Sequence, residues 1–537
     1  MENLAFEDIE LSNSKEKNEK DIEIITNGHE KNGDIIEIKS YSFEEAITLT
    51  GSGKFHRLLL LTSGLCFMAT MVEIMGVSLV IELAKCDMDF TIYEQGILAS
   101  SGFLGVVCSS HALGFLADTV GRSKILKFAL IFSIISSAAS VFSTTVWMLI
   151  ILRFLVGFFI SGCQACVFSY MGEFHGKKTR LRNVTMLSCF LPLGLVVLPA
   201  LATIILPMKL ELYLGSMKFS SWRFLTLCNA IPTVLALIGV LCFPESPKYL
   251  LAQGRHDEAI EVMKKCYKMN TNMDPSTYPV EKVYLDVVGA NFSNVKTVCD
   301  ALKLIWSQTV PLFNRERIFH TLNIFFIMFN IFMIAQGTFM WFPVMLNAMV
   351  HYADTDFTIC ESVRELKKVT ETMNYNVTTD IDELEMACED NIDIYMYQVL
   401  IMMGIAYTIL YLIFSWVIVY TGKRRLIIIF LTIAGAGSIA LYWTNIFYVN
   451  LILITLTMAV GNCGGITNTI SMEYYPTNIN AMGMCLIMMI GRIGAIVGSN
   501  IIGLILNSNC EFLYMMYGAL IILMIPLAFL LPNTNKT

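Results

Sequence analysis

The sequence contains little charge for its length: only 15% of its 537 residues are Asp, Glu, Lys or Arg, whereas 55% are hydrophobic. A soluble chain would carry charge on roughly 25% of its residues. It also lacks a complete phosphate-binding loop, a His-Glu-x-x-His motif, paired Cys-x-x-Cys sets and a nucleophile elbow. These absences argue against ATP-driven transport and hydrolytic chemistry. We therefore expect that the protein is not an enzyme and that it binds no cofactor and no metal.

Two further features are missing. The net charge of −7 comes without a dense basic patch, which argues against nucleic acid as a partner. The N-terminus is acidic and polar, without a basic stretch followed by an apolar core, so we predict no cleavable signal peptide. Most of the 15 cysteines lie inside apolar runs, where they are expected to be reduced and to act as small hydrophobic residues.

Long apolar runs dominate what is present. A helix needs about 20 apolar residues to span a membrane, and the sequence contains twelve such runs. We therefore predict an all-α polytopic membrane protein with twelve transmembrane helices in two six-helix halves, residues 58–243 and 321–531. The runs lie near 58–81, 96–113, 125–143, 147–171, 184–206, 223–243, 321–344, 396–420, 426–443, 447–470, 481–506 and 511–531.

The polar segments lie before, between and after the two halves. Residues 1–57 carry 13 acidic and seven basic side chains, which predicts a mostly disordered tail with a short helix near 42–51. Residues 244–320 are predicted to form a cytoplasmic helical domain, with a simple linker as the alternative. Residues 532–537 are a short terminal tail. The acidic first tail could bind cytoplasmic proteins.

Basic residues gather in alternate loops, and such loops favour the cytoplasmic side. If both termini are cytoplasmic, all of these loops fall on that side. The loop 345–395, on the opposite side, holds twelve acidic residues and three basic ones. The basic loops contain Arg122 and Lys124, Lys177 to Arg182, Lys248 and Arg255, and Lys423 to Arg425.

The acidic loop carries two candidate modification sites. Asn376-Val377-Thr378 matches the glycosylation pattern and lies on the non-cytoplasmic face that glycosylation requires. Cys360 and Cys388 share the loop, and an oxidising compartment would allow a disulfide between them. Spacing alone does not decide whether these two cysteines are bonded.

The segment from Gly114 to Lys124 joins the second and third runs as a tight charged turn. Its pattern, Gly-x-x-x-Asp-x-x-Gly-Arg-x-Lys, resembles the loop between helices 2 and 3 of the major facilitator superfamily. We expect Gly114 to permit close approach of two backbones and Gly121 to permit the turn. The resemblance implies a secondary-transporter fold that moves a small solute by alternating access.

Several other segments resemble synaptic vesicle glycoprotein 2 and its relatives within that superfamily. They are Ala69–Glu73, Gly254–Ala259, Phe339–Pro343 and Glu473–Thr477, while Gly491–Ala495 resembles the wider organic-ion and sugar branch. The resemblance implies a small solute, most simply an organic ion, as substrate. It also implies a plasma-membrane or vesicle location. The chain is expected to be a monomer in a lipid bilayer.

The sequence departs from the family pattern at three positions: Thr70 replaces an Asp, Val419 an acid and Asn480 an Arg. These departures favour the alternative function, a non-transporting vesicle membrane protein that regulates trafficking or exocytosis through cytoplasmic partners. The complete first-half loop favours transport.

Ionisable groups inside membrane spans are costly and invite a functional explanation. Glu73 and Arg492 are therefore candidates for binding a substrate or coupling ion, and Asn330 and Gln336 for lining the pathway. A hydrogen-bonded structural role is the alternative for Glu73. A conformational gate is predicted from Gly114, Asp118, Gly121, Arg122, Lys124, Arg153, Glu173, Arg180 and Glu473.

Overall fold

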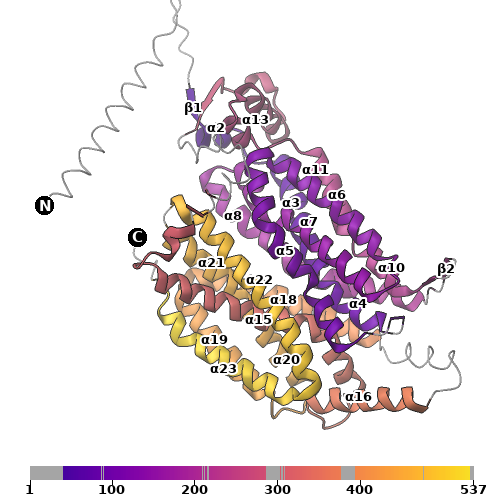
Figure 1. Cartoon of the computed structure of the whole chain (residues 1–537). Helices are drawn as coiled ribbons and strands as arrows, with labels where there is room; N and C mark the ends of the chain where they lie inside the picture. The colour runs from indigo at the N-terminus through magenta and orange to yellow at the C-terminus, as the bar shows by residue number, and fades with distance from the viewer. Residues whose placement is uncertain are drawn as a thin grey trace, which may run out of the picture.

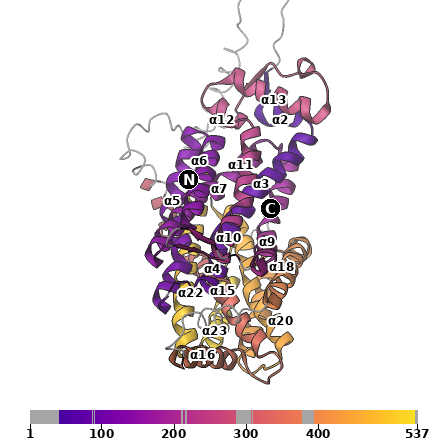
Figure 2. The same cartoon turned by 90° about the vertical axis from the view of Figure 1, so that its right-hand side faces the viewer.

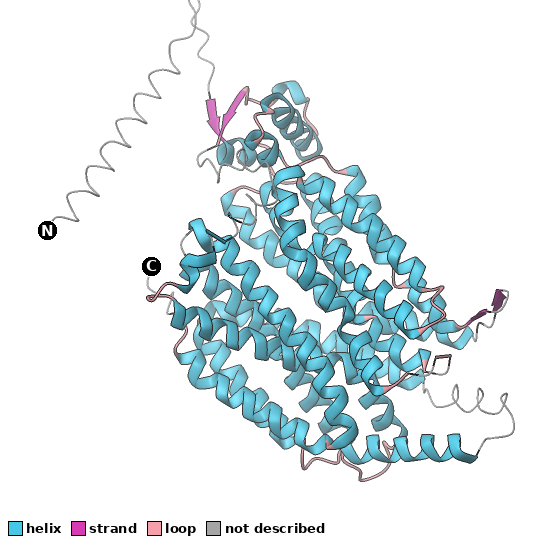
Figure 3. Cartoon of the chain, in the orientation of Figure 1, coloured by secondary structure: helices cyan, strands magenta, loops and turns pink. Residues whose placement is uncertain are grey.

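The computed structural model describes residues 40–532, apart from 86, 89, 209, 211, 215–216, 286–302, 304–305, 308, 377–393 and 476. The predictions for residues 1–39 and 533–537 lie outside this part of the chain. Helices dominate, and two short sheets lie at opposite ends of the molecule (Figure 3).

The first half contains six spans, three of which are broken into two helices. The break in the first span, at Gly76, faces the break in the sixth, because a Cβ on Gly76 would lie 2.9 Å from Asn229 Nδ2. The helices are α3 (Lys54–Met75), α4 (Val77–Ala84), α5 (Ile92–Val120), α6 (Arg122–Ser140), α7 (Val146–Glu173), α8 (Lys177–Ser188), α9 (Phe190–Ile205), α10 (Ser221–Cys228) and α11 (Ile231–Cys242). The 3₁₀ turn η1 (Leu206–Met208) and the strand pair β2 (Leu212–Leu214) and β3 (Met217–Phe219) join α9 to α10.

The second half repeats the six-span plan. Its fourth span bends at a 3₁₀ turn between two helices. The elements are η4 (Val310–Phe313), α15 (Ile318–His351), α18 (Ile394–Thr421), α19 (Lys423–Ala440), α20 (Phe447–Met458), η5 (Ala459–Gly461), α21 (Asn462–Tyr474), α22 (Thr477–Ser508) and α23 (Cys510–Phe529).

Eleven helical segments of the described chain are long and apolar enough to cross a membrane. The remaining predicted run, 426–443, corresponds to α19, whose first turn holds three basic residues, Lys423, Arg424 and Arg425. Because α19 packs lengthwise against α23, it belongs to the same bundle. The predicted all-α polytopic architecture is therefore confirmed.

The two halves lie side by side and meet along three helix pairs, α5 with α22, α9 with α18, and α4 with α15 (Figure 1). Within the first half, Gly105 and Gly157 bring α5 and α7 into backbone contact, because a Cβ on either would overlap a carbonyl oxygen of the other helix. The close approach predicted at Gly114 is wrong: a Cβ there would lie 3.9 Å from its nearest neighbour, Ala165.

One end of the bundle, which we call the basic end, holds Arg122, Lys177 and Lys423. A small accessory unit covers the first half there (Figure 2). It consists of β1 (Ser40–Ser42), α2 (Phe43–Leu49), α12 (Pro247–Ala252), α13 (His256–Thr271), η2 (Pro275–Thr277) and β4 (Lys282–Tyr284). Strands β1 and β4 pair in parallel, and Ser42 and Glu45 form a capping box that begins α2, where the sequence predicts a short helix.

The accessory unit has its own apolar core, which includes Phe43, Ile47, Leu250, Met263 and Tyr278. The segment just before the first span therefore folds onto the segment that joins the two halves. The Tyr278 hydroxyl donates to the Ala46 carbonyl at 2.7 Å, within this core.

The opposite end carries α16 (Ile359–Asn376), which runs across the ends of the membrane helices (Figure 2). Cys360 forms a disulfide with Cys510, the first residue of α23, with their Cα atoms 5.5 Å apart. The pairing of Cys360 with Cys388, which the sequence left open, is therefore wrong. The shared loop made Cys388 a candidate partner, but the fold places the start of the last helix beside α16. Cys388 and the Asn376 side chain lie outside the described residues.

Candidate functional site

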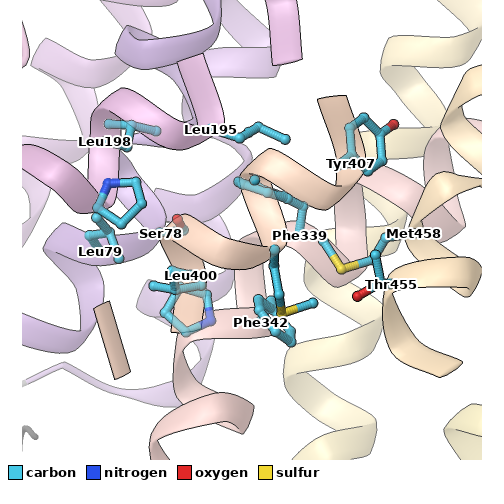
Figure 4. A pocket seen from close by; sticks show the side chains of 14 residues that line it. Ser78, Leu79, Leu195, Leu198, Phe339, Phe342, Leu400, Tyr407, Thr455 and Met458 are labelled. Atoms are coloured by element: carbon cyan, nitrogen blue, oxygen red, sulfur yellow. The ribbon is translucent and has the colours of Figure 1, made fainter. Parts of the chain in front are cut away.

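A pocket lies between the two halves, lined by α4 and α9 from the first half and by α15, α18 and α20 from the second (Figure 4). The space between these helices amounts to about 540 Å³, a volume that includes open solvent. Most of its lining is apolar, with Phe339 and Phe342 facing Leu195 and Leu198. Its surface is suited to the apolar part of a small organic molecule.

Three hydroxyl groups interrupt this apolar lining: Ser78 on α4, Tyr407 on α18 and Thr455 on α20. The Ser78 hydroxyl donates to the Met75 carbonyl at 2.8 Å, and the Thr455 hydroxyl to Leu451 at 2.6 Å. Both donors are therefore occupied within their own helices. No Asp, Glu, Lys or Arg is among the described residues that line the pocket.

Two of the predicted pathway residues lie on α15 and differ in their environment. Asn330 donates from Nδ2 to the Phe326 carbonyl at 2.8 Å, a bond within its own helix. Gln336 lies one turn before Phe339, on the same side of α15 as the pocket, and its Oε1 is buried without a hydrogen-bond partner in the described chain. Gln336 is therefore the better placed of the two to meet a solute.

Arg492 lies on α22 and is only 8% exposed. Its guanidinium carbon lies 5.8 Å from the ring centre of Phe103 on α5 and 5.4 Å from that of Phe332 on α15. No carboxylate of the described chain pairs with it. Aromatic faces stabilise a cation, but by only ~1–2 kcal/mol. The charge of Arg492 therefore has no anionic counterpart in the described chain, and Arg492 lies at the interface of the halves without lining the pocket.

Glu73 has a different environment, because it is enclosed by helices of the first half. Its carboxylate lies 3.5 Å from the Arg153 guanidinium and accepts hydrogen bonds from Ser137 (3.0 Å) and Thr233 (3.3 Å). Glu73 is 1% exposed and Arg153 3%. Glu73 does not line the pocket, and the structure does not bring it together with Arg492.

The placement of Arg153 corrects its predicted grouping with the gate. Arg153 lies 20 residues before Glu173 on α7, which is about 30 Å along a helix at 1.5 Å per residue. It pairs with Glu73 and donates to Ser140 Oγ at 2.8 Å. The sequence could not separate these roles, because both positions lie on one long apolar helix.

Other predicted gate residues do gather at the basic end of the first half. Arg122 pairs with Asp118 at 3.0 Å and also with Glu173, so both of its acidic partners belong to the first half. Gly121 has φ +120°, a conformation that side chains disfavour, and Glu245 accepts from the Ser123 backbone N–H at 2.9 Å.

The remaining gate candidates make separate contacts. Arg180 pairs with Glu44 of the accessory unit at 2.7 Å and donates to the Gly172 carbonyl at 2.9 Å. Glu473 pairs with Lys423 in the second half. Lys124 is exposed to solvent. The predicted gate is therefore divided into a first-half cluster and a second-half pair.

A buried junction connects the accessory unit to the first half. Asn270 of α13 accepts from the Phe55 backbone N–H at 3.2 Å and donates to Thr50 O (3.1 Å). The same amide nitrogen lies 3.0 Å from His56 Nδ1. His175, whose ring lies 4.5 Å from that of His56, bonds through Nδ1 to Met171 O at 2.8 Å, and burial lowers its pKa to about 4.

Two helical bundles that meet around an interfacial pocket define a polytopic membrane protein with the two-half architecture of secondary transporters. The model of the Major Facilitator Superfamily matches residues 61–499. The chain belongs to the Major Facilitator Superfamily and is an integral membrane protein.

Among curated proteins, the chain is similar to two synaptic vesicle glycoproteins. It is 31% identical to synaptic vesicle glycoprotein 2B of Mus musculus over 46% of this chain and 36% of that protein. It is 32% identical to synaptic vesicle glycoprotein 2A of Homo sapiens over 50% of this chain and 35% of that protein. The matched stretch thus spans little more than a third of the length of these relatives.

Among solved structures, a partially occluded, inward-open form of the xylose transporter XylE from E. coli superposes with a TM-score of 0.62. The match covers 89% of this chain and all of that one at 14% identity, which supports a shared fold and nothing finer.

Sequence reasoning missed the pocket itself. Its walls are ordinary apolar residues such as Leu198 and Phe342, which look like any other membrane-helix residues. Asn462 and Tyr407 carry only a weak signal in the sequence, because helix–helix hydrogen bonding commonly explains an Asn in an apolar span, and packing or interfacial anchoring commonly explains a Tyr. No sequence feature shows that five helices from two halves leave a space between them.

Proposed function

We propose that the chain transports a small organic anion across a membrane by alternating access of its two halves. The observation that carries the proposal is Arg492, a buried cation at the interface of the halves with no carboxylate partner in the described chain. Glu73 does not offer a matching site for organic cations, because Arg153 already compensates its charge.

The pocket supports the organic part of this proposal. Phe332, beside Arg492, and Phe339, in the pocket, lie seven residues apart on α15, about 10 Å along one face of a helix. A solute with an apolar body in the pocket and an anionic group toward Arg492 fits this arrangement. A charge held in a low-dielectric site discriminates strongly between anions and cations.

The ion pairs of the basic end support the alternating-access part. The Arg122 cluster with Asp118 and Glu173 stabilises the first half, and the pair of Lys423 with Glu473 stabilises the second. We place the basic end in the cytoplasm, since basic loops remain there. The membrane is a plasma or vesicle membrane, the latter in keeping with the vesicle glycoproteins that the chain resembles.

The experiment is uptake into liposomes that contain the purified full chain, with a panel of labelled organic anions, organic cations and neutral sugars. We expect saturable uptake of anions, and a loss of at least tenfold in Arg492→Gln because one charge-assisted bond contributes about 1.5–3 kcal/mol. Arg255→Gln is the matched control, since Arg255 is exposed and pairs only locally with Glu258.

Two outcomes would contradict the proposal. One is anion uptake that Arg492→Gln leaves unchanged in folded protein; the other is uptake confined to cations. Folded protein that moves none of the panel would favour the alternative function, a vesicle membrane protein that works through cytoplasmic partners.

A further inference from the structure

Two buried polar atoms near the pocket lack hydrogen-bond partners within the described chain. One is Oε1 of Gln336 on α15, and the other is Nδ2 of Asn462 on α21. Buried polar groups are nearly always satisfied, so such atoms need an explanation. The two are complementary, because an amide oxygen accepts a hydrogen bond and an amide nitrogen donates one.

The helices that carry these atoms touch at the intervening position. A Cβ placed on Gly461 would lie 3.2 Å from the Ala335 Cβ and 3.1 Å from the Tyr407 hydroxyl. Since Ala335 precedes Gln336 and Gly461 precedes Asn462, this contact brings the two unsatisfied amides to the same region. Tyr407 lines the pocket, so that region borders it.

Helix periodicity gives the same placement for Gln336 independently. Gln336 lies three residues before Phe339, a pocket residue, within the continuous helix α15. Residues three or four apart share a helix face. Gln336 therefore lies one turn from the pocket lining toward the basic end, and the contact at Gly461 places Asn462 in the same region.

The features follow a fixed order along α15. Phe339 belongs to the apolar pocket, Gln336 comes one turn earlier, in the region where Asn462 also lies, and Phe332 lies one further turn along beside Arg492. The order along α15 is thus an apolar wall, then a donor and an acceptor, then a cation.

From this order we propose that the transported solute is an N-acyl amino acid, a carboxylate joined through an amide to an apolar acyl group. Asn462 donates to the amide carbonyl, Gln336 accepts from the amide N–H, the acyl group occupies the pocket, and the carboxylate meets Arg492. This inference rests on the proposed function and adds the substrate class.

The test compares three probes that share a benzoyl group in liposomes with the full chain. N-benzoylglycine has the amide and the carboxylate; benzoyloxyacetate replaces the N–H by an ester oxygen; the methyl ester of N-benzoylglycine has no charge. We expect uptake of the amide acid to exceed that of the ester acid about tenfold, the usual effect of one hydrogen bond.

Variants assign that preference to individual atoms. Gln336→Met should bring the two acids to similar uptake, because the acceptor for the N–H is lost. Asn462→Leu should reduce both acids alike, since both keep the carbonyl. Thr338→Val is the matched control: Thr338 is a buried residue of α15 two positions after Gln336, and it therefore lies on a different face of the helix.

Equal uptake of the two acids by the unaltered chain, or a preference that survives Gln336→Met, would overturn the inference. The proposed function would still stand if both acids exceed the methyl ester and Arg492→Gln removes that difference. If no anion of any kind enters the liposomes, the proposed function fails, and the inference fails with it.

Discussion

Replacing Glu73 by Gln removes the negative charge of a buried ion pair while keeping the size of the side chain. Arg153 then remains 3% exposed, with Ser140 Oγ as a hydrogen-bond acceptor at 2.8 Å and with Nε unpaired in the described chain. Breaking a buried pair from one side destabilises proteins by about 3–5 kcal/mol, because an uncompensated charge is left behind. We therefore expect Glu73→Gln to lower the free energy of unfolding by about 3–5 kcal/mol.

The reverse change, Arg153→Met, should destabilise less. The carboxyl group of Glu73 can take up a proton and keep its hydrogen bonds to Ser137 and Thr233, whereas a guanidinium group stays charged. The double variant Glu73→Gln/Arg153→Met removes both charges and should unfold within about 1 kcal/mol of the unaltered chain.

The assay is the free energy of unfolding in mixed micelles, measured for all four proteins, together with uptake into liposomes. We expect the double variant to recover both stability and uptake, because Glu73 lies outside the pocket. Losses that simply add in the double variant would refute the coupling of the two residues. Recovered stability without recovered uptake would instead assign Glu73 a direct role in ion coupling.

Two other predictions follow from the ends of the bundle. Cys360→Ser should lower the free energy of unfolding by about 2–4 kcal/mol, whereas Cys108→Ser, at a free and exposed cysteine, should leave it nearly unchanged; equal losses would contradict the pairing of Cys360 with Cys510. Burial lowers the pKa of His175 to about 4, below the value of about 6.5 in an unfolded chain, so the unfolded chain binds the extra proton and stability should fall as the pH drops from about 6.5 to about 4. His175→Gln should flatten that dependence in thermal unfolding between these pH values, and an unchanged slope would contradict it.

The sequence was sufficient for the architecture because membrane spans follow from composition alone. The predicted run 147–171 corresponds to α7, Val146–Glu173, and the basic and acidic loops lie at opposite ends. The lengths of the individual helices were harder to predict. The seventh run was expected to end at residue 344, near Pro343, but helix α15 continues to His351. Proline is tolerated within membrane helices because neighbouring helices satisfy the freed backbone groups.

The sequence did not predict which side chains pair with one another across different helices. Glu73 and Arg153 lie 80 residues apart on different spans, and hydrophobic periodicity does not show which faces of two helices meet. Cys360 illustrates the same limit, because its partner lies 150 residues away. The packing of whole helices decides which residues meet, and that packing is not visible in the spacing of cysteines within one loop.

The attachments at the two ends of the bundle bear on how the halves move. The accessory unit is attached to the first half at two places. Asn270 of α13 accepts a hydrogen bond from Phe55 at the start of α3, and Glu44 pairs with Arg180 on α8. Helix α16 joins the second half, through its packing on α15 and the disulfide to α23. Each attachment therefore lies on a single bundle and does not bridge the two. If the halves rock as the proposed function requires, we expect the motion at α5–α22, α9–α18 and α4–α15, the contacts between the halves that border the pocket and Arg492.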